Sequence, residues 1–137
     1  MIPEAPDPRI LIRSDADIVE ARQAGRDLAI RIGLGDIEAT KVATAIAEVA
    51  RNMLLFAGTG EIVLSTEARG RLSGLVVVAR DHGPGISDVP MALQDGTSTN
   101  GGLGLGLPTA RRMMDEFEVV SAQGRGTTIT MKRWARR

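Results

Sequence analysis

Three polar side chains interrupt an otherwise apolar run between Ala45 and Ala57, and their spacing could support chemistry. They are Glu48, Arg51 and Asn52. The run contains no Gly or Pro and is rich in Ala and Leu, which predicts a buried helix. Glu48 and Asn52 are four residues apart and share one helix face, and Mg²⁺ uses carboxylate and amide oxygens together with phosphate and water. A simpler alternative remains open, in which Glu48 pairs with Arg51 and Asn52 caps nearby backbone.

A second candidate stretch begins at Asp81, where a predicted strand over 74–80 ends. Gly83 and Gly85 follow at alternate positions, and glycine lets a ligand approach the backbone closely. A buried carboxylate facing such a gap could accept a hydrogen bond from an exocyclic amine such as that of adenine. The alternative is an ordinary Gly-Pro turn with a solvated aspartate.

The third stretch runs from Gly101 to Pro108 and leads directly into a predicted helix. Glycine-rich backbone N–H groups and the positive end of a helix suit phosphate. The stretch is not a Walker P-loop, and no βαβ unit surrounds it, which argues against a Rossmann site. Residues 95–106 are predicted to be a mobile loop, and a lid without any ligand remains the alternative. His82, the one histidine, is given no catalytic role.

Composition excludes several classes of function. The 137 residues suit one domain, and 17 basic against 17 acidic residues leave no net charge for strong non-specific nucleic-acid binding. Two Phe and one Trp are too few for a base-stacking platform, and the absence of Cys excludes disulfides, thiolate metal sites and a Cys nucleophile. There is neither a membrane-length apolar run nor a signal peptide, so we expect a cytoplasmic protein that binds no membrane and no nucleic acid.

Hydrophobic periodicity predicts an α+β fold, with about three helices packed on one face of a mixed, mostly antiparallel sheet of about five strands. The domain is expected over 9–134, after an irregular lead-in at 1–8 and before a solvated basic tail at 135–137 that continues the run Lys132 to Arg137. The predicted helices cover 15–32, 36–56 and 107–117, with one helical turn at 88–94. The predicted strands cover 9–13, 61–68, 74–80, 118–123 and 127–133, the last two joined by a hairpin turn at 124–126.

The order of these stretches carries a family resemblance. A helix with Glu48 and Asn52 precedes Asp81-x-Gly-x-Gly, then a glycine-rich loop that opens a helix, then Thr127 in a late strand. This order resembles the N, G1 and G2 boxes of the GHKL ATPases, which include gyrase, Hsp90, histidine kinases and MutL. It implies the Bergerat fold, with ATP held between helices and sheet under a mobile lid. Within this superfamily the chain resembles the RsbT-type serine/threonine-protein kinases of the stressosome, from about Arg9 to Trp134.

The resemblance implies a role for each site residue. Glu48 would be the general base, Asn52 would hold Mg²⁺ through the ATP phosphates, and Asp81 would bind the adenine amino group. The other residues implied to bind ATP are Gly83, Gly85 and Ile86 around the adenine, Thr127 beneath it, and Gly101, Gly102, Leu103, Gly104, Leu105 and Gly106 around the phosphates. The cation at the γ-phosphate is left open between Arg51 and Arg111.

The implied function is an ATP-dependent protein serine/threonine kinase in a partner-switching signalling pathway. Its substrates would be STAS-domain proteins, either anti-sigma-factor antagonists or scaffold proteins, and after release it would activate a downstream phosphatase by binding. The alternative is an anti-sigma factor with kinase activity that sequesters a sigma subunit. A nucleotide-gated binding module without phosphate transfer is a third possibility, against which the intact Glu48 and Asn52 argue. Glu48, Asn52, Asp81, Gly83 and Gly106 are expected to line one pocket, and ATP is expected to order the lid.

Overall fold

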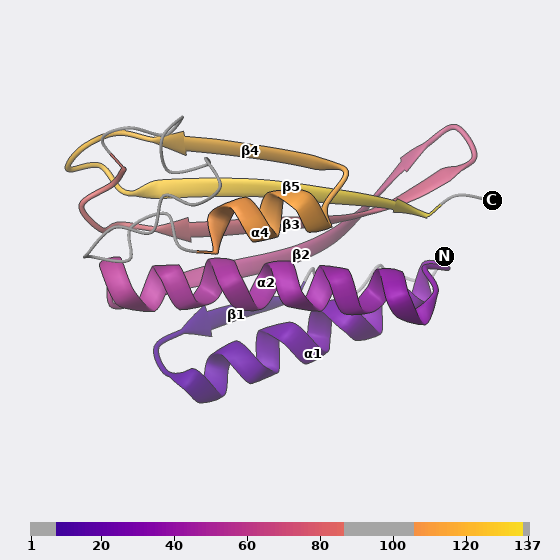
Figure 1. Cartoon of the computed structure of the whole chain (residues 1–137), viewed down its shortest axis with the longest axis horizontal. Coiled ribbons are helices and arrows are strands. Elements are labelled where there is room, and N and C mark those ends of the chain that lie inside the picture. Colours follow the sequence, from indigo (N-terminus) through magenta and orange to yellow (C-terminus); the bar gives the residue numbers. More distant parts are fainter. Residues whose placement is uncertain (1–7, 87–105, 136–137) are drawn as a thin grey trace, which may run out of the picture.

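The computed structural model describes residues 8–86 and 106–135, which form one layer of helices against one sheet (Figure 1). The helices are α1 (Asp15–Arg31), α2 (Asp36–Phe56) and α4 (Leu107–Met113). The strands are β1 (Arg9–Ile12), β2 (Gly60–Arg69), β3 (Leu72–Asp81), β4 (Glu116–Ser121) and β5 (Thr127–Ala135). The predicted α+β class is therefore confirmed.

The sheet has the strand order β1-β2-β3-β5-β4, and each pair of neighbours is antiparallel. The central strand, β3, pairs with β2 on one side and with β5 on the other. In the second pairing Asp81 stands opposite Thr127. This register brings the end of β3 and the start of β5 together at one edge of the sheet, although the two residues are far apart in the sequence.

Alternation along the strands explains why the helices cover only one face. Leu75, Val77 and Ala79 of β3 point toward the helices and are at most 2% exposed. The helix α2 packs against them and lies between α1 and α4 (Figure 1), which accounts for its nearly continuous apolar sequence. At the crossing of α1 and α2, a Cβ on Gly25 would overlap Ile46, so glycine permits this close approach.

Several strand ends differ by one or two residues from the prediction, and two errors at the ends of α4 and β5 concern the pairing of the sheet. The helix α4 ends at Met113, and Phe117 lies in β4, because Met114 is extended and the Asp115 N–H donates to the Lys132 carbonyl oxygen at 2.9 Å. The basic tail was predicted to be solvated. Instead β5 continues to Ala135, which is 2% exposed, one residue beyond the predicted end of the domain. The predicted helical turn at 88–94 lies outside the described residues.

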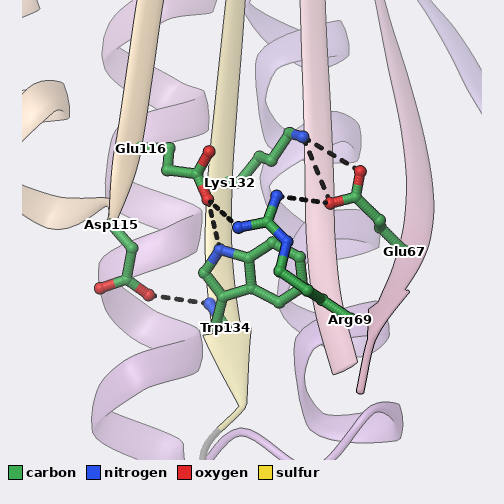
Figure 2. Close-up of polar contacts among 6 residues, drawn as sticks. All are labelled: Glu67, Arg69, Asp115, Glu116, Lys132 and Trp134. Carbon is green, nitrogen blue, oxygen red and sulfur yellow. Dashed lines mark hydrogen bonds and ion pairs between the residues drawn. The ribbon is translucent and has the colours of Figure 1, made fainter. Parts of the chain in front are cut away.

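A polar and aromatic cluster covers part of the helix-free face of the sheet (Figure 2). Trp134 stacks under the Arg69 guanidinium, 4.4 Å from the ring centroid, and its Nε1–H donates to Glu116 Oε2 at 2.6 Å. Lys132 pairs with Glu67 at 3.0 Å, so the cluster joins β2, β5 and β4. Its members come from distant segments, and each cation has a carboxylate beside it.

Gly74 stands opposite Trp134, and a Cβ at this position would lie 2.7 Å from the indole ring. Because Arg69 and Glu116 hold the ring, Gly74→Ala is expected to lower the free energy of unfolding by about 1–3 kcal/mol through overpacking. Urea unfolding followed by the fluorescence of Trp134, the one tryptophan, measures this change. Ala68→Ser is the control, since it also adds one heavy atom in the same sheet, at an exposed position of β2. Equal stability of Gly74→Ala and the wild type would contradict the argument.

Candidate functional site

The polar residues of α2 contact one another along one side of the helix. Arg51 Nη1 lies 3.2 Å from Glu48 Oε1, and Asn52 Nδ2 donates to the Glu48 carbonyl oxygen at 3.1 Å. The contacts of the simpler alternative from the sequence are therefore present. They do not enclose Glu48, whose side chain remains 27% exposed. Of the two candidate cations for the γ-phosphate, Arg51 is thus paired with Glu48, and Arg111 is exposed on α4.

A pocket opens between α2 and the sheet edge where β3 ends and β5 begins. Its walls are mostly aliphatic and aromatic, and its polar groups come from Asn52, Asp81 and Thr127. The lining residues are Val49, Asn52, Met53, Phe56, Ala79, Asp81, Pro84, Gly85, Ile86, Leu107, Thr127 and Ile129. Apolar walls with a few converging polar groups are the usual lining of a small-molecule site.

Asp81 is fixed at the pocket by the turn that follows it. Its Oδ1 accepts a hydrogen bond from the Gly83 N–H at 2.9 Å, so Oδ2 is the less occupied of its two acceptor oxygens. The two glycines of this turn, Gly83 and Gly85, are also packed closely against other parts of the protein. A Cβ on Gly83 would lie 2.6 Å from Ala57 Cβ, and Gly85 has φ +80° and faces the Ala122 carbonyl oxygen. Glycine is therefore required there for the fold, whether or not a ligand is bound.

Ser121 joins the turn to the strand beneath the pocket. Its Oγ accepts from the Ile86 N–H at 2.7 Å, donates to the Gly126 carbonyl oxygen at 3.1 Å and lies 2.8 Å from Thr127 Oγ1. A hydroxyl carries one hydrogen, so a Ser121 that donates to Gly126 must accept from Thr127. Thr127, 8% exposed and the buried polar residue of the described chain, then keeps its acceptor lone pairs for the pocket.

Glu48 meets the start of α4 at the margin of this pocket. Gly106, with φ +86°, precedes α4, and a Cβ on it would overlap Glu48 Oε2. One carboxylate oxygen of Glu48 therefore contacts Arg51 and the other faces Gly106. The next residue, Leu107, is buried and lines the pocket. A general base at this place would stand beside the segment where the glycine-rich loop ends.

The structure brings most of the predicted site residues together. Asn52, Asp81, Gly85, Ile86 and Thr127 line the pocket. Gly83 is bonded to Asp81 beside it, and Glu48 and Gly106 lie against each other at its margin without lining it. The predicted phosphate-binding residues Gly101, Gly102, Leu103, Gly104 and Leu105, with the rest of the predicted lid, lie outside the described residues.

Sequence reasoning missed the apolar walls and the serine beneath the pocket. Val49, Met53 and Phe56 recur at helical spacing beside Asn52, so their pattern could have assigned them to the pocket. Ser121 gave no such signal, since Thr127 is brought to it only by the pairing of β4 with β5, and Ile86 only by the turn that follows β3.

Helices on one face of an antiparallel sheet, over a pocket that ends at a strand-terminal aspartate, define a histidine kinase-like ATPase domain. The chain belongs to this family, whose profile, described as "Histidine kinase-like ATPase domain", matches residues 13–133. In sequence it is 45% identical to the serine/threonine-protein kinase RsbT of Bacillus subtilis over 127 residues, which cover 93% of this chain and 96% of that protein. It is 29% identical to an anti-sigma F factor of Clostridium kluyveri over 100 residues, 70% of each chain.

Solved structures show the same fold at low sequence identity. The mycobacterial sensor histidine kinase MprB aligns with a TM-score of 0.54 at 18% identity, covering 95% of this chain and 98% of that one. The catalytic domain of the histidine kinase ThkA aligns with a TM-score of 0.53 at 13% identity, covering 93% and 96%. The identification as an RsbT-type serine/threonine-protein kinase of the GHKL superfamily is confirmed at the level of family and enzyme class. Among the described helices, none has the length and apolar character needed to cross a membrane.

Proposed function

We propose that this protein uses Mg-ATP to phosphorylate a serine or threonine of a STAS-domain partner in a partner-switching pathway of the cytoplasm, where ATP is available. The observation that supports this proposal is the placement of the Glu48 carboxylate against Gly106, at the margin of a pocket that contains Asp81 and Thr127. The 45% identity to a serine/threonine-protein kinase supports the same reaction.

In this proposal the nucleotide is held by residues at both ends of the pocket. Asp81 Oδ2 accepts from the adenine amino group, and Thr127 accepts from a water or from the base. Met53 and Ile129 give the purine apolar contact from the helix and from the sheet. Asn52 would hold Mg²⁺, which would neutralise charge on the phosphates. The family resemblance assigns residues 101–106 to the β- and γ-phosphates.

Glu48 is the general base for the acceptor hydroxyl. As the serine oxygen bonds to the γ-phosphorus and the bond from phosphorus to ADP breaks, the hydroxyl proton passes to the carboxylate and then to solvent. Arg51 holds Oε1 at 3.2 Å, so Oε2 is the oxygen that can receive this proton. Phosphoryl transfer depends on positioning and charge stabilisation, and this geometry supports both.

Transfer of label from γ-labelled ATP to a purified STAS-domain protein of the same organism tests the proposal. We expect phosphate on a serine or threonine of that protein, dependent on Mg²⁺, and identified by mass spectrometry. The same mixture chelated with EDTA is the control. If the kinase binds ATP but labels none of the organism's STAS-domain proteins, the proposed substrate class is wrong.

A second candidate function is an anti-sigma factor whose kinase activity controls release of a sigma subunit. The similarity to anti-sigma F factors favours keeping it, although 29% identity is well below the 45% to RsbT. Binding of purified sigma subunits distinguishes the two functions. A stable complex with a sigma subunit in the presence of nucleotide would favour the second.

We further propose that the substrate and a downstream phosphatase regulator bind overlapping surfaces. A standard interface takes about 800 Å² per partner, which is a large share of so small a domain. A phosphorylated serine adds up to about two negative charges beside Glu48 and the nucleotide, so repulsion should eject the product. Phosphorylated substrate is therefore expected to bind at least about 10-fold more weakly than unphosphorylated substrate in a competition assay. Equal affinities, or a ternary complex with the regulator, would contradict this switch.

A further inference from the structure

One line of side chains along α2 contains both the proposed base and two of the most exposed aliphatic residues. Ile37, Thr44, Glu48 and Leu55 follow at intervals of seven, four and seven residues, which on an α-helix places them within about 20° of a common line. Ile37 is 73% exposed and Leu55 is 63% exposed. These four residues are called the α2 line below.

At its first half the α2 line forms one side of an apolar groove. The groove is lined by Asp36, Ile37, Thr40, Lys41 and Thr44 of α2 and by Met113 from the end of α4. The two threonine hydroxyls are turned inward. Thr40 Oγ1 donates to the Asp36 carbonyl oxygen and Thr44 Oγ1 donates to the Thr40 carbonyl oxygen, each at 2.9 Å. With these polar atoms satisfied within the helix, the threonines offer their methyl groups to the groove.

We propose that the α2 line is the docking surface of the protein substrate, with apolar side chains of that substrate covering Ile37 and Leu55 on either side of the acceptor serine. The proposal rests on the proposed kinase function. A serine can be phosphorylated only if it reaches Glu48, so the protein carrying it must lie over the part of α2 that exposes Glu48. Residues on the same line of the helix are the first to be covered when it does.

The dimensions fit one folded partner. At 1.5 Å per residue, Ile37 lies about 16 Å from Glu48 along the helix axis, and Leu55 lies about 10 Å from it in the other direction. The two ends are thus about 27 Å apart. A round interface of about 800 Å² is about 32 Å across, so a single standard interface spans the whole line. Exposed aliphatic anchors on both sides of a reactive group would hold the serine at a fixed place between them.

Ile37→Ser and Leu55→Ser remove these contacts without touching the buried core. The chain offers a matched control in Val120→Ser, since Val120 is also 63% exposed but lies on the helix-free face of the sheet. Phosphorylation of the STAS-domain protein labelled in the experiment above is measured as a function of substrate and of ATP. Each single variant is expected to raise KM for the protein substrate about 5-fold. The double variant should raise it about 25-fold, because sites this far apart act additively.

The KM for ATP and the kcat at saturating substrate should remain those of the wild type, as should all constants of Val120→Ser. A general folding defect would instead change ATP binding. If Ile37→Ser and Leu55→Ser leave the KM for the protein substrate unchanged, the docking surface is wrong while the kinase function stands. If the wild type itself transfers no phosphate to any STAS-domain protein, the proposed function fails, and the inference that rests on it fails with it.

Discussion

Glu48→Gln is expected to bind Mg-ATP nearly as the wild type does and to lose about 10²–10⁴ in the rate of phosphoryl transfer. Glutamine has almost the same shape, and its amide oxygen can still accept from Arg51, which lies 3.2 Å from Glu48 Oε1. It cannot take up a proton at neutral pH. The pocket residues that would hold the nucleotide, such as Asp81 and Thr127, are untouched by the change.

Single-turnover transfer to the protein substrate measures the loss, and calorimetric titration with ATP measures binding. Glu20→Gln provides a control for the loss of one negative charge, since Glu20 is an exposed residue of α1. Its transfer rate should equal that of the wild type. Full activity of Glu48→Gln would remove the general base from the mechanism and leave positioning and charge stabilisation as the whole of the catalysis.

The long helix could be predicted because local chemistry and tertiary packing agree there. A run without Gly or Pro, with Asp36 as the predicted N-cap and Gly58 as the end, gives 36–56 from the sequence; the structure has Asp36–Phe56, with Gly35 as the N-cap. The predicted end of α4 was wrong because local chemistry and tertiary packing disagree there. The apolar residues up to Phe117 continue a helical pattern, but pairing of β4 with β5 places Phe117 opposite Met131 in the sheet. A local pattern carries no information about that pairing.

The basic end of the chain shows the same limit more clearly. Lys132 and Arg133 suggest a solvated tail by composition, yet each is paired with carboxylates from distant segments. Their charges are matched by Glu67 and Asp115, which lie 65 and 18 positions away in the sequence. Trp134 is buried because Gly74, on a neighbouring strand, leaves space for its ring. Only the sheet register reveals these partners.

Much of the site could be predicted, because its key residues are marked by type and spacing. Glu48 and Asn52 are polar in an apolar helix, and Asp81 ends an apolar strand before two glycines. The support around them could not be predicted. Ser121 bonds to Ile86, 35 residues away, and Gly83 packs against Ala57, 26 residues away. Such contacts follow from the fold as a whole and have no local signature.

Asp81→Asn is expected to weaken ATP binding about 10²-fold while leaving the fold intact. The Gly83 N–H already occupies one acceptor, Oδ1, at 2.9 Å. In the asparagine variant the amide oxygen must keep that bond, so the NH₂ group faces the pocket. Two donors, this NH₂ and the adenine amino group, then oppose each other in a largely apolar site. Leaving buried donors without acceptors costs about 1–3 kcal/mol, and the upper end of this range corresponds to the expected loss.

The nucleotide itself supplies the control for this change. Purine riboside triphosphate lacks the 6-amino group, so the wild type should bind it more weakly than ATP. Asp81→Asn, whose NH₂ opposes the amino group of ATP alone, should bind purine riboside triphosphate at least as tightly as ATP. This double comparison isolates the pairing of one carboxylate oxygen with one amino group from any general effect of the substitution. Urea unfolding of the variant should match that of the wild type. If Asp81→Asn bound both nucleotides as the wild type does, Asp81 would not contact the base, and the pocket beside it would need a different ligand.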